Sequence, residues 1–247
     1  MTAPLLVAHR GAPSRGATEN TVRAFREAAA AGADGVEMDV RGTRDGRAVV
    51  FHDAEAALPG RRRAAVRSLS LEELRDPALE AHDRVASLEE TLRALLARTG
   101  VIVEVKEPGI EERVCAVIAS LKADRRLPWL LLASFHPGVL RRVKRSAPGV
   151  RRALVVSRRG PGLGGWIRGR WPLRAWRESG AEDLMPDHHL VTPALVEAVA
   201  ARGGHVFAWT VNEPEEARRV VEAGAAGVVT DDLAGVGSSV RTGGEGG

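Results

Sequence analysis

The feature of this 247-residue chain that most constrains its fold is a repeated alternation of short apolar runs with amphipathic stretches. The apolar runs span four to seven residues and are rich in valine, leucine and isoleucine, which is typical of buried strands. In most of the intervals between these runs, apolar residues recur with the spacing of an amphipathic helix. This order predicts the α/β class, with a mainly parallel sheet and helices outside it. We expect nine strands: Leu5–Arg10, Gly35–Val40, Ala48–His52, Val101–Lys106, Trp129–Phe135, Arg152–Val156, Ala181–Met185, His205–Thr210 and Gly227–Thr230.

Capping signals mark the helices between these strands. Ser87 and Glu90 have the spacing of a capping box at the start of a helix over Leu88–Arg98. A second helix is expected over Asn20–Ala31, with Asn20 as its cap rather than as a contact of the site. About eight strand–helix units suit a closed (β/α)8 barrel of ~250 residues, but a doubly wound open sheet suits the same pattern nearly as well. The alternation alone therefore leaves both architectures open.

Two stretches interrupt the alternation. Residues 54–86 contain a Pro-Gly pair and a run of three arginines, which we interpret as an excursion from the main domain. Residues 158–178 place Trp166, Trp171 and Trp176 among glycines and arginines. Tryptophan and arginine favour a membrane surface, so this stretch could contact lipid. We favour the alternative, an outer cover whose tryptophans pack on the domain.

Composition and charge narrow the class of protein. The net charge is only +4 and most arginines alternate with acids, which argues against a nucleic-acid partner. Cys115 is the single cysteine, so no internal disulfide can form. No leader pattern precedes Leu5, and no apolar run approaches the ~20 residues that span a bilayer. We expect a cytoplasmic enzyme with one domain over residues 1–234 and a Gly/Ser-rich disordered tail over 235–247.

Ionisable residues stand at the ends of the first two apolar runs. His9 and Arg10 end the first run, directly before a glycine. Glu37 and Asp39 are two residues apart in the second, which puts both carboxylates on one face of a strand. Like charges on a buried face repel and lose solvation unless a cation lies between them. Oxygen ligands alone favour Mg2+, Mn2+ or Ca2+ over zinc.

The next apolar runs end in the same way. His52 and Asp53 end the third, and Glu104 and Lys106 share one face at the end of the fourth. One such end is explained by a buried ion pair, but four in the first half of a chain are not. In a barrel, the carboxyl ends of the strands lie on one face, where catalytic groups assemble.

These motifs, in this order, resemble those of the glycerophosphodiester phosphodiesterases, and the resemblance extends from about residue 5 to residue 233. The matching segments are His9-Arg10-Gly11, Glu19-Asn20-Thr21, Glu37-Met38-Asp39, His52-Asp53, Glu104-Val105-Lys106, Ser134-Phe135, Trp209-Thr210-Val211-Asn212 and Gly227-Val228-Val229-Thr230-Asp231. The resemblance implies a (β/α)8 barrel with a small insertion after the strand carrying His52. Residues 54–86 match that insertion by position, which favours the barrel over the open sheet.

The resemblance also implies a role for each matched residue. One divalent cation, Mg2+ or Ca2+, is expected at three carboxylates: Glu37, Asp39 and Glu104. Two histidines, His9 and His52, are expected to be the general acid and base, in an order left open. Phosphate and substrate contacts are expected from Arg10, Lys106 and Trp209, with Glu19 supporting Arg10 or a histidine.

The reaction implied is hydrolysis of a small glycerophosphodiester to glycerol 3-phosphate and an alcohol. Direct attack by water and a cyclic phosphate intermediate both stay open. The alternatives are a lysophospholipase D that uses the same site on lipids, for which residues 158–178 would be the reason, and a barrel that binds without turnover. We expect His136 to begin a helix, and we expect no metal at His188 and His189 without a third ligand nearby.

Overall fold

A computed structural model of the chain describes residues 3–12, 17–57, 63–76, 80–81, 83–95, 97–122, 128–158 and 171–242. Eight parallel strands in it form a barrel, and hydrogen bonds join them in the order β10-β11-β1-β2-β6-β7-β8-β9. Bridges from Leu184 to Val206 and from Asp187 to Trp209 join β9 to β10 and close the circle. The strands are β1 (Leu5–Ala8), β2 (Gly35–Gly42), β6 (Gly100–Val105), β7 (Leu130–Ser134), β8 (Arg151–Val156), β9 (Asp183–Pro186), β10 (Phe207–Ala208) and β11 (Gly227–Thr230).

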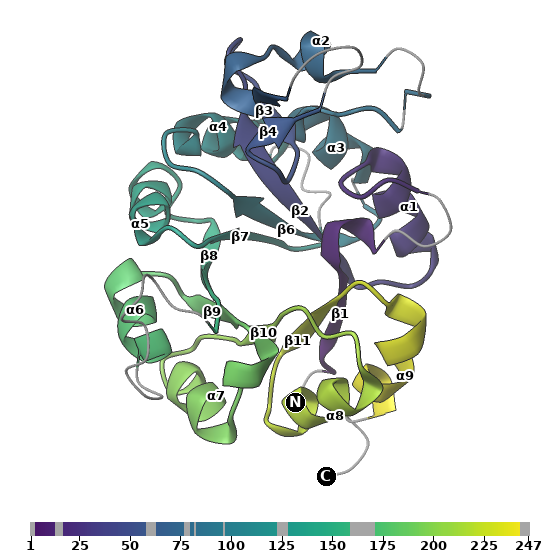
Figure 1. The fold of residues 1–247 in the computed structure, drawn as a ribbon. Coiled ribbons are helices and arrows are strands. Elements are labelled where there is room, and N and C mark those ends of the chain that lie inside the picture. The colour runs from purple at the N-terminus through teal and green to yellow at the C-terminus, as the bar shows by residue number, and fades with distance from the viewer. Residues whose placement is uncertain are drawn as a thin grey trace.

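Helices form a ring around the strands, as Figure 1 shows. They are α1 (Val22–Ala30), α3 (Leu88–Leu95), α4 (Glu111–Lys122), α5 (Pro137–Ser146), α6 (Trp171–Ser179), α7 (Pro193–Ala200), α8 (Pro214–Glu222) and α9 (Leu233–Thr242). The predicted capping box is present, because Ser87 N–H donates to Glu90 and Glu90 N–H donates to the Ser87 hydroxyl. The predicted (β/α)8 barrel is confirmed, and the open-sheet alternative is wrong.

Alternating residues of each strand face opposite sides of the barrel wall. One set packs against the helices in the large core. The other set forms a separate apolar cluster that fills the barrel interior: Val7, Ile102, Leu131, Ala133, Ala153, Val155, Met185, Phe207 and Val229. Because the interior is packed with side chains, ligands meet the barrel at its rim rather than inside a pore.

Aromatic rings occupy the amino ends of the strands. A Cβ atom on Gly100 would lie 1.9 Å from the Trp129 ring, and one on Gly35 would lie 2.5 Å from the same ring. Likewise, a Cβ atom on Gly227 would lie 2.6 Å from the Phe207 ring. These three glycines therefore make the space in which the two rings pack.

His52 follows a strand that turns back on the barrel. β3 (Ala48–Val50) pairs antiparallel with the far end of β2, with Val40 opposite Val50. We predicted a mainly parallel sheet without assigning this strand a direction, and it is the antiparallel member of the sheet. The turn over residues 43–47 is far too short for a parallel crossover, which needs a dozen residues or more.

The stretch after His52 forms a small unit outside the barrel, beside β3 (Figure 1). It contains β4 (Glu55–Ala56), β5 (Ala64–Ala65), a 3-10 turn η2 (Val66–Ser68) and α2 (Leu71–Leu74). Its own apolar cluster consists of Val49, Ala56, Val66, Leu69, Leu71 and Leu74. This unit therefore packs on the β3 side of the barrel rather than on the ring of helices.

The predicted disordered tail is wrong as far as Thr242. Residues 235–242 belong to α9, in which Val236 and Val240 are fully buried. Their spacing of four residues puts both on one helical face, and burial of that face outweighs the poor helix propensity of glycine and serine. Arg241 also donates to the Gly32 carbonyl at 2.7 Å. The rest of the predicted tail lies outside the described residues.

The tryptophan-rich stretch is described only in part. Trp176 in α6 is 3% exposed and packs in the core, so this ring cannot contact a membrane. Trp166 and the side chain of Trp171 lie outside the described residues. Across the described ranges, no helix combines the length and apolar character needed to cross a bilayer.

Candidate active site

Three buried carboxylates meet at the carboxyl ends of β2 and β6. Glu37 and Asp39 face the barrel interior from β2, and Glu104 is the register partner of Asp39 on β6. Their residues are 2%, 1% and 8% exposed, respectively. One oxygen from each carboxylate lies within 4.8 Å of the others. The strand register therefore brings together the three acids that the sequence singled out.

The electrostatics of this cluster fit a bound cation. Among the described residues, Glu37 Oε1 is buried and accepts no hydrogen bond, whereas the buried Asp39 Oδ1 and Glu104 Oε1 lie against the Lys106 ammonium group. Burial, together with the charge of Asp39, raises the pKa of Glu37 to about 8, and burial also raises the pKa of Glu104. Buried carboxylates that resist ionisation until a positive charge arrives, as Glu37 and Glu104 do, are suitable ligands for Mg2+ or Ca2+.

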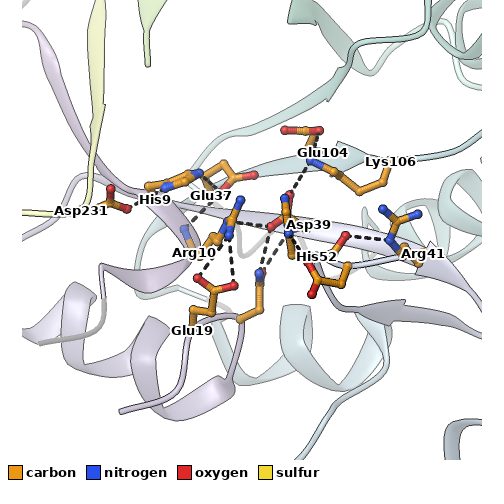
Figure 2. A network of polar contacts seen from close by, with 12 residues as sticks. His9, Arg10, Glu19, Glu37, Asp39, Arg41, His52, Glu104, Lys106 and Asp231 are labelled. Atoms are coloured by element: carbon orange, nitrogen blue, oxygen red, sulfur yellow. Dashed lines mark hydrogen bonds and ion pairs between the residues drawn. The ribbon is translucent and has the colours of Figure 1, made fainter. Parts of the chain in front are cut away.

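Two cationic side chains lie against the same acids. Lys106 Nζ is 2.7 Å from Glu104 Oε1 and 3.1 Å from Asp39 Oδ1, and Arg10 Nε is 3.0 Å from Asp39 Oδ2. Burial opposes ionisation of Asp39, but Lys106 and Arg10 outweigh it and lower the pKa of this carboxyl. Arg10 also donates from Nη1 to Glu19 at 3.0 Å, so Glu19 contacts the arginine and not the acidic cluster (Figure 2).

A tight left-handed turn places Arg10 over the cluster. Arg10, Gly11 and Ala12 have φ of 51°, 88° and 43°. A Cβ on Gly11 would lie 2.7 Å from the Ala24 Cβ, so the close approach of α1 requires glycine there. The backbone N–H of Arg10 donates to Glu37 Oε2 at 3.1 Å. The acidic cluster and the arginine turn therefore hold each other in place.

Asn20 is a site residue that the sequence analysis assigned wrongly. The cap of α1 is Thr21, whose side chain accepts from the Ala24 N–H. Asn20 lies in the left-handed region at φ 59°, and its side chain brackets Asp39. Its Nδ2 donates to Asp39 Oδ2 at 2.9 Å, and its Oδ1 accepts from the Asp39 N–H at 3.1 Å. The available signal was that asparagine, among non-glycine residues, tolerates this conformation well.

Asp231, which directly follows β11, orients the His9 ring. Its Nδ1 is 2.7 Å from Asp231 Oδ1, and its Nε2 is 3.9 Å from Glu37 Oε2. Burial lowers the pKa of His9, but the hydrogen bond to Asp231 and the charge of Glu37 outweigh it and raise this pKa overall. The hydrogen bond also lowers the pKa of Asp231. We did not assign a role to Asp231 from the sequence, although its place after β11 was the available signal.

His52 lies on the other side of the network from His9, beside Asp39 (Figure 2). Its Nδ1 is 2.8 Å from Asp53 Oδ1, and its carbonyl accepts from Arg41 Nε at 2.7 Å. The side chains of His52 and Asp53 are 34% and 56% exposed. His52 is thus held by its own sequence neighbour at the surface, whereas His9 is held by a residue 222 positions away in the chain.

Aromatic residues line the rim next to Lys106. Trp209 Nε1 donates to the Met185 carbonyl at 2.9 Å, and its ring meets Phe135 edge-on with centroids 5.5 Å apart. Lys106 Nζ is 5.7 Å from the centre of the Phe135 ring. His136 precedes α5 as predicted, and its Nε2 lies 3.2 Å from the Lys106 carbonyl.

The histidine pair after β9 has a neighbour that we did not foresee. Asp187, His188 and His189 have potential ligand atoms within 4.8 Å of one another. His189 Nδ1 is 2.8 Å from Asp187, and His188 Nδ1 is 3.0 Å from Glu216. Each of these ring nitrogens therefore already has a carboxylate partner. This group is separate from the cluster of Glu37.

The fold and the site define a class of protein. A closed (β/α)8 barrel with acids, histidines and cationic side chains at the carboxyl ends of its strands is the architecture of a barrel enzyme with a candidate metal centre. The family model described as the glycerophosphoryl diester phosphodiesterase family matches residues 9–234. The chain therefore belongs to the glycerophosphoryl diester phosphodiesterase family.

Individual relatives agree with this membership. A glycerophosphodiester phosphodiesterase of Caldanaerobacter subterraneus subsp. tengcongensis is 32% identical, over 97% of this chain and 99% of its own length. A solved structure from Silicibacter pomeroyi has a TM-score of 0.82 at 26% identity, covering 98% of this chain and 94% of that one. An Oleispira antarctica phosphodiesterase in complex with the product sn-glycerol-3-phosphate has a TM-score of 0.78 at 25% identity, covering 96% and 97%. The predicted family and the predicted enzyme class are confirmed.

Proposed function

We propose that this chain hydrolyses small glycerophosphodiesters to glycerol 3-phosphate and an alcohol, using one divalent cation and two histidines. The observation that supports this most directly is the convergence of three buried carboxylates, of which Glu37 Oε1 accepts no hydrogen bond. The Oleispira relative, solved with sn-glycerol-3-phosphate, supports the choice of product. Glu37, Asp39 and Glu104 would hold Mg2+ or Ca2+, and the bound ion would polarise the phosphoryl oxygens as a Lewis acid.

The formal charges of the site favour a phosphodiester. The three carboxylates, once ionised, face two cationic side chains, Arg10 and Lys106, which leaves one negative charge. A divalent cation reverses this to one positive charge, which the single negative charge of a phosphodiester neutralises. A phosphomonoester carries between ~1.5 and 2 negative charges near neutral pH, so it leaves an excess of negative charge. The site therefore suits the substrate better than the phosphorylated product, which assists release.

His9 and His52 would divide the proton transfers. One imidazole accepts the proton of the attacking hydroxyl, from water or from the substrate, as the new P–O bond forms. The other donates a proton to the departing oxygen as the second P–O bond breaks, because an alkoxide is a poor leaving group. Imidazole serves both steps since its ordinary pKa is close to neutral pH.

The remaining predicted residues would bind the substrate. Arg10 and Lys106 lie within ion-pair distance of the acidic cluster, so their charges face the position of a phosphate bound beside it. Glu19 would hold the Arg10 guanidinium in this orientation. Trp209 would contribute the apolar wall of the rim beside Lys106, through its edge-on contact with Phe135.

The test is release of glycerol 3-phosphate from glycerophosphocholine by the purified protein with added Mg2+ or Ca2+. We expect activity that EDTA abolishes and that His9→Ala or His52→Ala each reduce by at least ~100-fold. Glu112→Gln, which changes an exposed residue of α4, is the matched control and should leave the rate unchanged. Full activity of His52→Ala would refute the use of two histidines, and full activity in EDTA would refute the metal.

A further inference from the structure

We propose that Asp231 and Asn212 act as a pair that fixes the tautomer and the orientation of His9. This inference rests on the proposed role of His9, and it assigns a positioning function to two residues that do not touch the acidic cluster. They stand directly after β11 and shortly after β10, so neighbouring strand ends supply them. The two residues make a continuous chain of contacts that ends on the imidazole.

The contacts of Asn212 leave its amide only one orientation. Its Oδ1 accepts from the Asp231 backbone N–H at 2.9 Å and from the Thr230 hydroxyl at 3.2 Å. The backbone N–H can only donate, so exchanging the side-chain oxygen and the NH2 group would place two donors against each other. The NH2 group of Asn212 therefore faces Asp231, where Nδ2 donates to Oδ2 at 3.0 Å.

That bond decides which atom Asp231 presents to His9. With Oδ2 used by Asn212, Oδ1 is the oxygen at 2.7 Å from His9 Nδ1. A carboxylate only accepts hydrogen bonds, so the neutral imidazole must carry its proton on Nδ1. The lone pair then lies on Nε2, the ring atom that faces Glu37 at 3.9 Å. His52 also has a carboxylate at Nδ1, but this comes from the adjacent Asp53, whose other oxygen lies 3.5 Å from Arg63 Nη2 rather than against an amide.

This geometry makes a specific prediction for Asp231→Asn. The Asn212 NH2 group requires an acceptor, so the new amide at position 231 must turn its oxygen toward Asn212 and its own NH2 group toward His9. His9 Nδ1 would then have to accept, and the proton would move to Nε2, the wrong atom. We expect kcat/KM to fall by at least tenfold, on the order of 100-fold.

The double variant Asp231→Asn/Asn212→Asp reverses this effect. A carboxylate at position 212 accepts from the Asp231 backbone N–H, as Asn212 does, and also accepts from the new NH2 group at 231. The new amide oxygen then turns back to His9 and accepts from Nδ1–H. The net charge of the pair is unchanged, and only the group that carries it moves. We expect the double variant to regain at least half of the loss on a logarithmic scale.

The experiment combines glycerophosphocholine kinetics with 15N NMR of the His9 ring in the Mg2+-saturated protein, at a pH where the imidazole is neutral. We expect Nδ1–H in the parent, Nε2–H in Asp231→Asn and Nδ1–H again in the double variant. Glu216→Gln removes a carboxylate from His188 and is the matched control, with kinetics and His9 signals like the parent. Thermal unfolding of each variant reports whether it is folded. If Asp231→Asn does not fold, Asp231→Ala replaces it, which removes the acceptor from His9 Nδ1 and should give a mixture of both tautomers with a reduced rate.

Two results would overturn the assignment. One is an unchanged His9 tautomer in Asp231→Asn. The other is a loss of activity in Asp231→Asn that the double variant does not regain although it is folded, because Asp231 would then act directly and not through His9. Absence of phosphodiesterase activity in the parent would refute the proposed function alone, since the NMR comparison needs no turnover.

Discussion

Binding of the cation should release a proton, and Glu37 should be its main source. Burial raises the pKa of this carboxyl to about 8, with Asp39 and Glu104 adding to the shift and His9 opposing it. Below that pH the metal-free protein holds a proton that must leave before the carboxylate can bind a metal. Affinity should therefore rise with pH up to about 8 and level off above it.

The size of this pH effect follows from the number of protons released on binding. Binding that releases one proton weakens about tenfold for each pH unit below the pKa, so Mg2+ should bind about 100-fold more weakly at about pH 6 than at about pH 9, where the carboxyl is ionised. This corresponds to ~2.7 kcal/mol. Isothermal titration calorimetry measures both quantities, because the heat in buffers of different ionisation enthalpy gives the number of protons released.

Two variants test whether Glu37 is the source of the released proton. Glu37→Gln should bind Mg2+ weakly and should show a much smaller dependence on pH, because this side chain has no proton to release. Glu112→Gln on the exposed face of α4 should behave like the parent. Affinity that stays constant between about pH 6 and about pH 8, with no proton released, would refute a Glu37 carboxyl that holds a proton in the metal-free protein and loses it on binding.

Three further predictions concern the packing that supports the site. Asn20→Ala leaves the buried N–H of Asp39 without a partner. Calorimetry should therefore show about tenfold weaker Mg2+ binding, and thermal unfolding should show a stability loss of ~1–3 kcal/mol. Unchanged values of both would contradict the contact. Gly100→Ala forces a methyl group onto the Trp129 ring and should cost at least ~1–3 kcal/mol by urea unfolding, with part of it regained in Gly100→Ala/Trp129→Leu. Val240→Ala should destabilise the protein by roughly 2 kcal/mol if α9 packs as described, whereas a disordered segment would show no change.

The strand ends were predictable because they depend only on local patterns. Continuous apolar runs predicted all nine strands of the main sheet, and parallel strands bring their carboxyl ends to one rim. For that reason Glu37, Asp39 and Glu104 could be placed together before any coordinates were known. The register of Asp39 opposite Glu104 then followed from pairing of β2 with β6.

The features that were missed depend on contacts between distant residues. Asparagine is a common helix cap, so its residue type predicted that role for Asn20. Its side chain instead donates to Asp39, a contact that only the folded structure shows. Asp231 contacts His9 because β11 pairs with β1, and that pairing exists only once the barrel closes. The glycines and serines of α9 suggest disorder, whereas burial of Val236 and Val240 decides otherwise.

The rings of Trp129 and Phe207 pack over Gly35, Gly100 and Gly227 at the amino end of the barrel, so within the described ranges packed side chains separate that end from the acidic cluster. Cation, substrate, water and both products must all pass through the rim of strand carboxyl ends. A phosphate bound beside the acidic cluster would lie between a cation held there and this rim, so the metal should exchange more slowly during turnover than at rest. For the same reason each product competes with the next substrate for entry, and inhibition by glycerol 3-phosphate should be competitive.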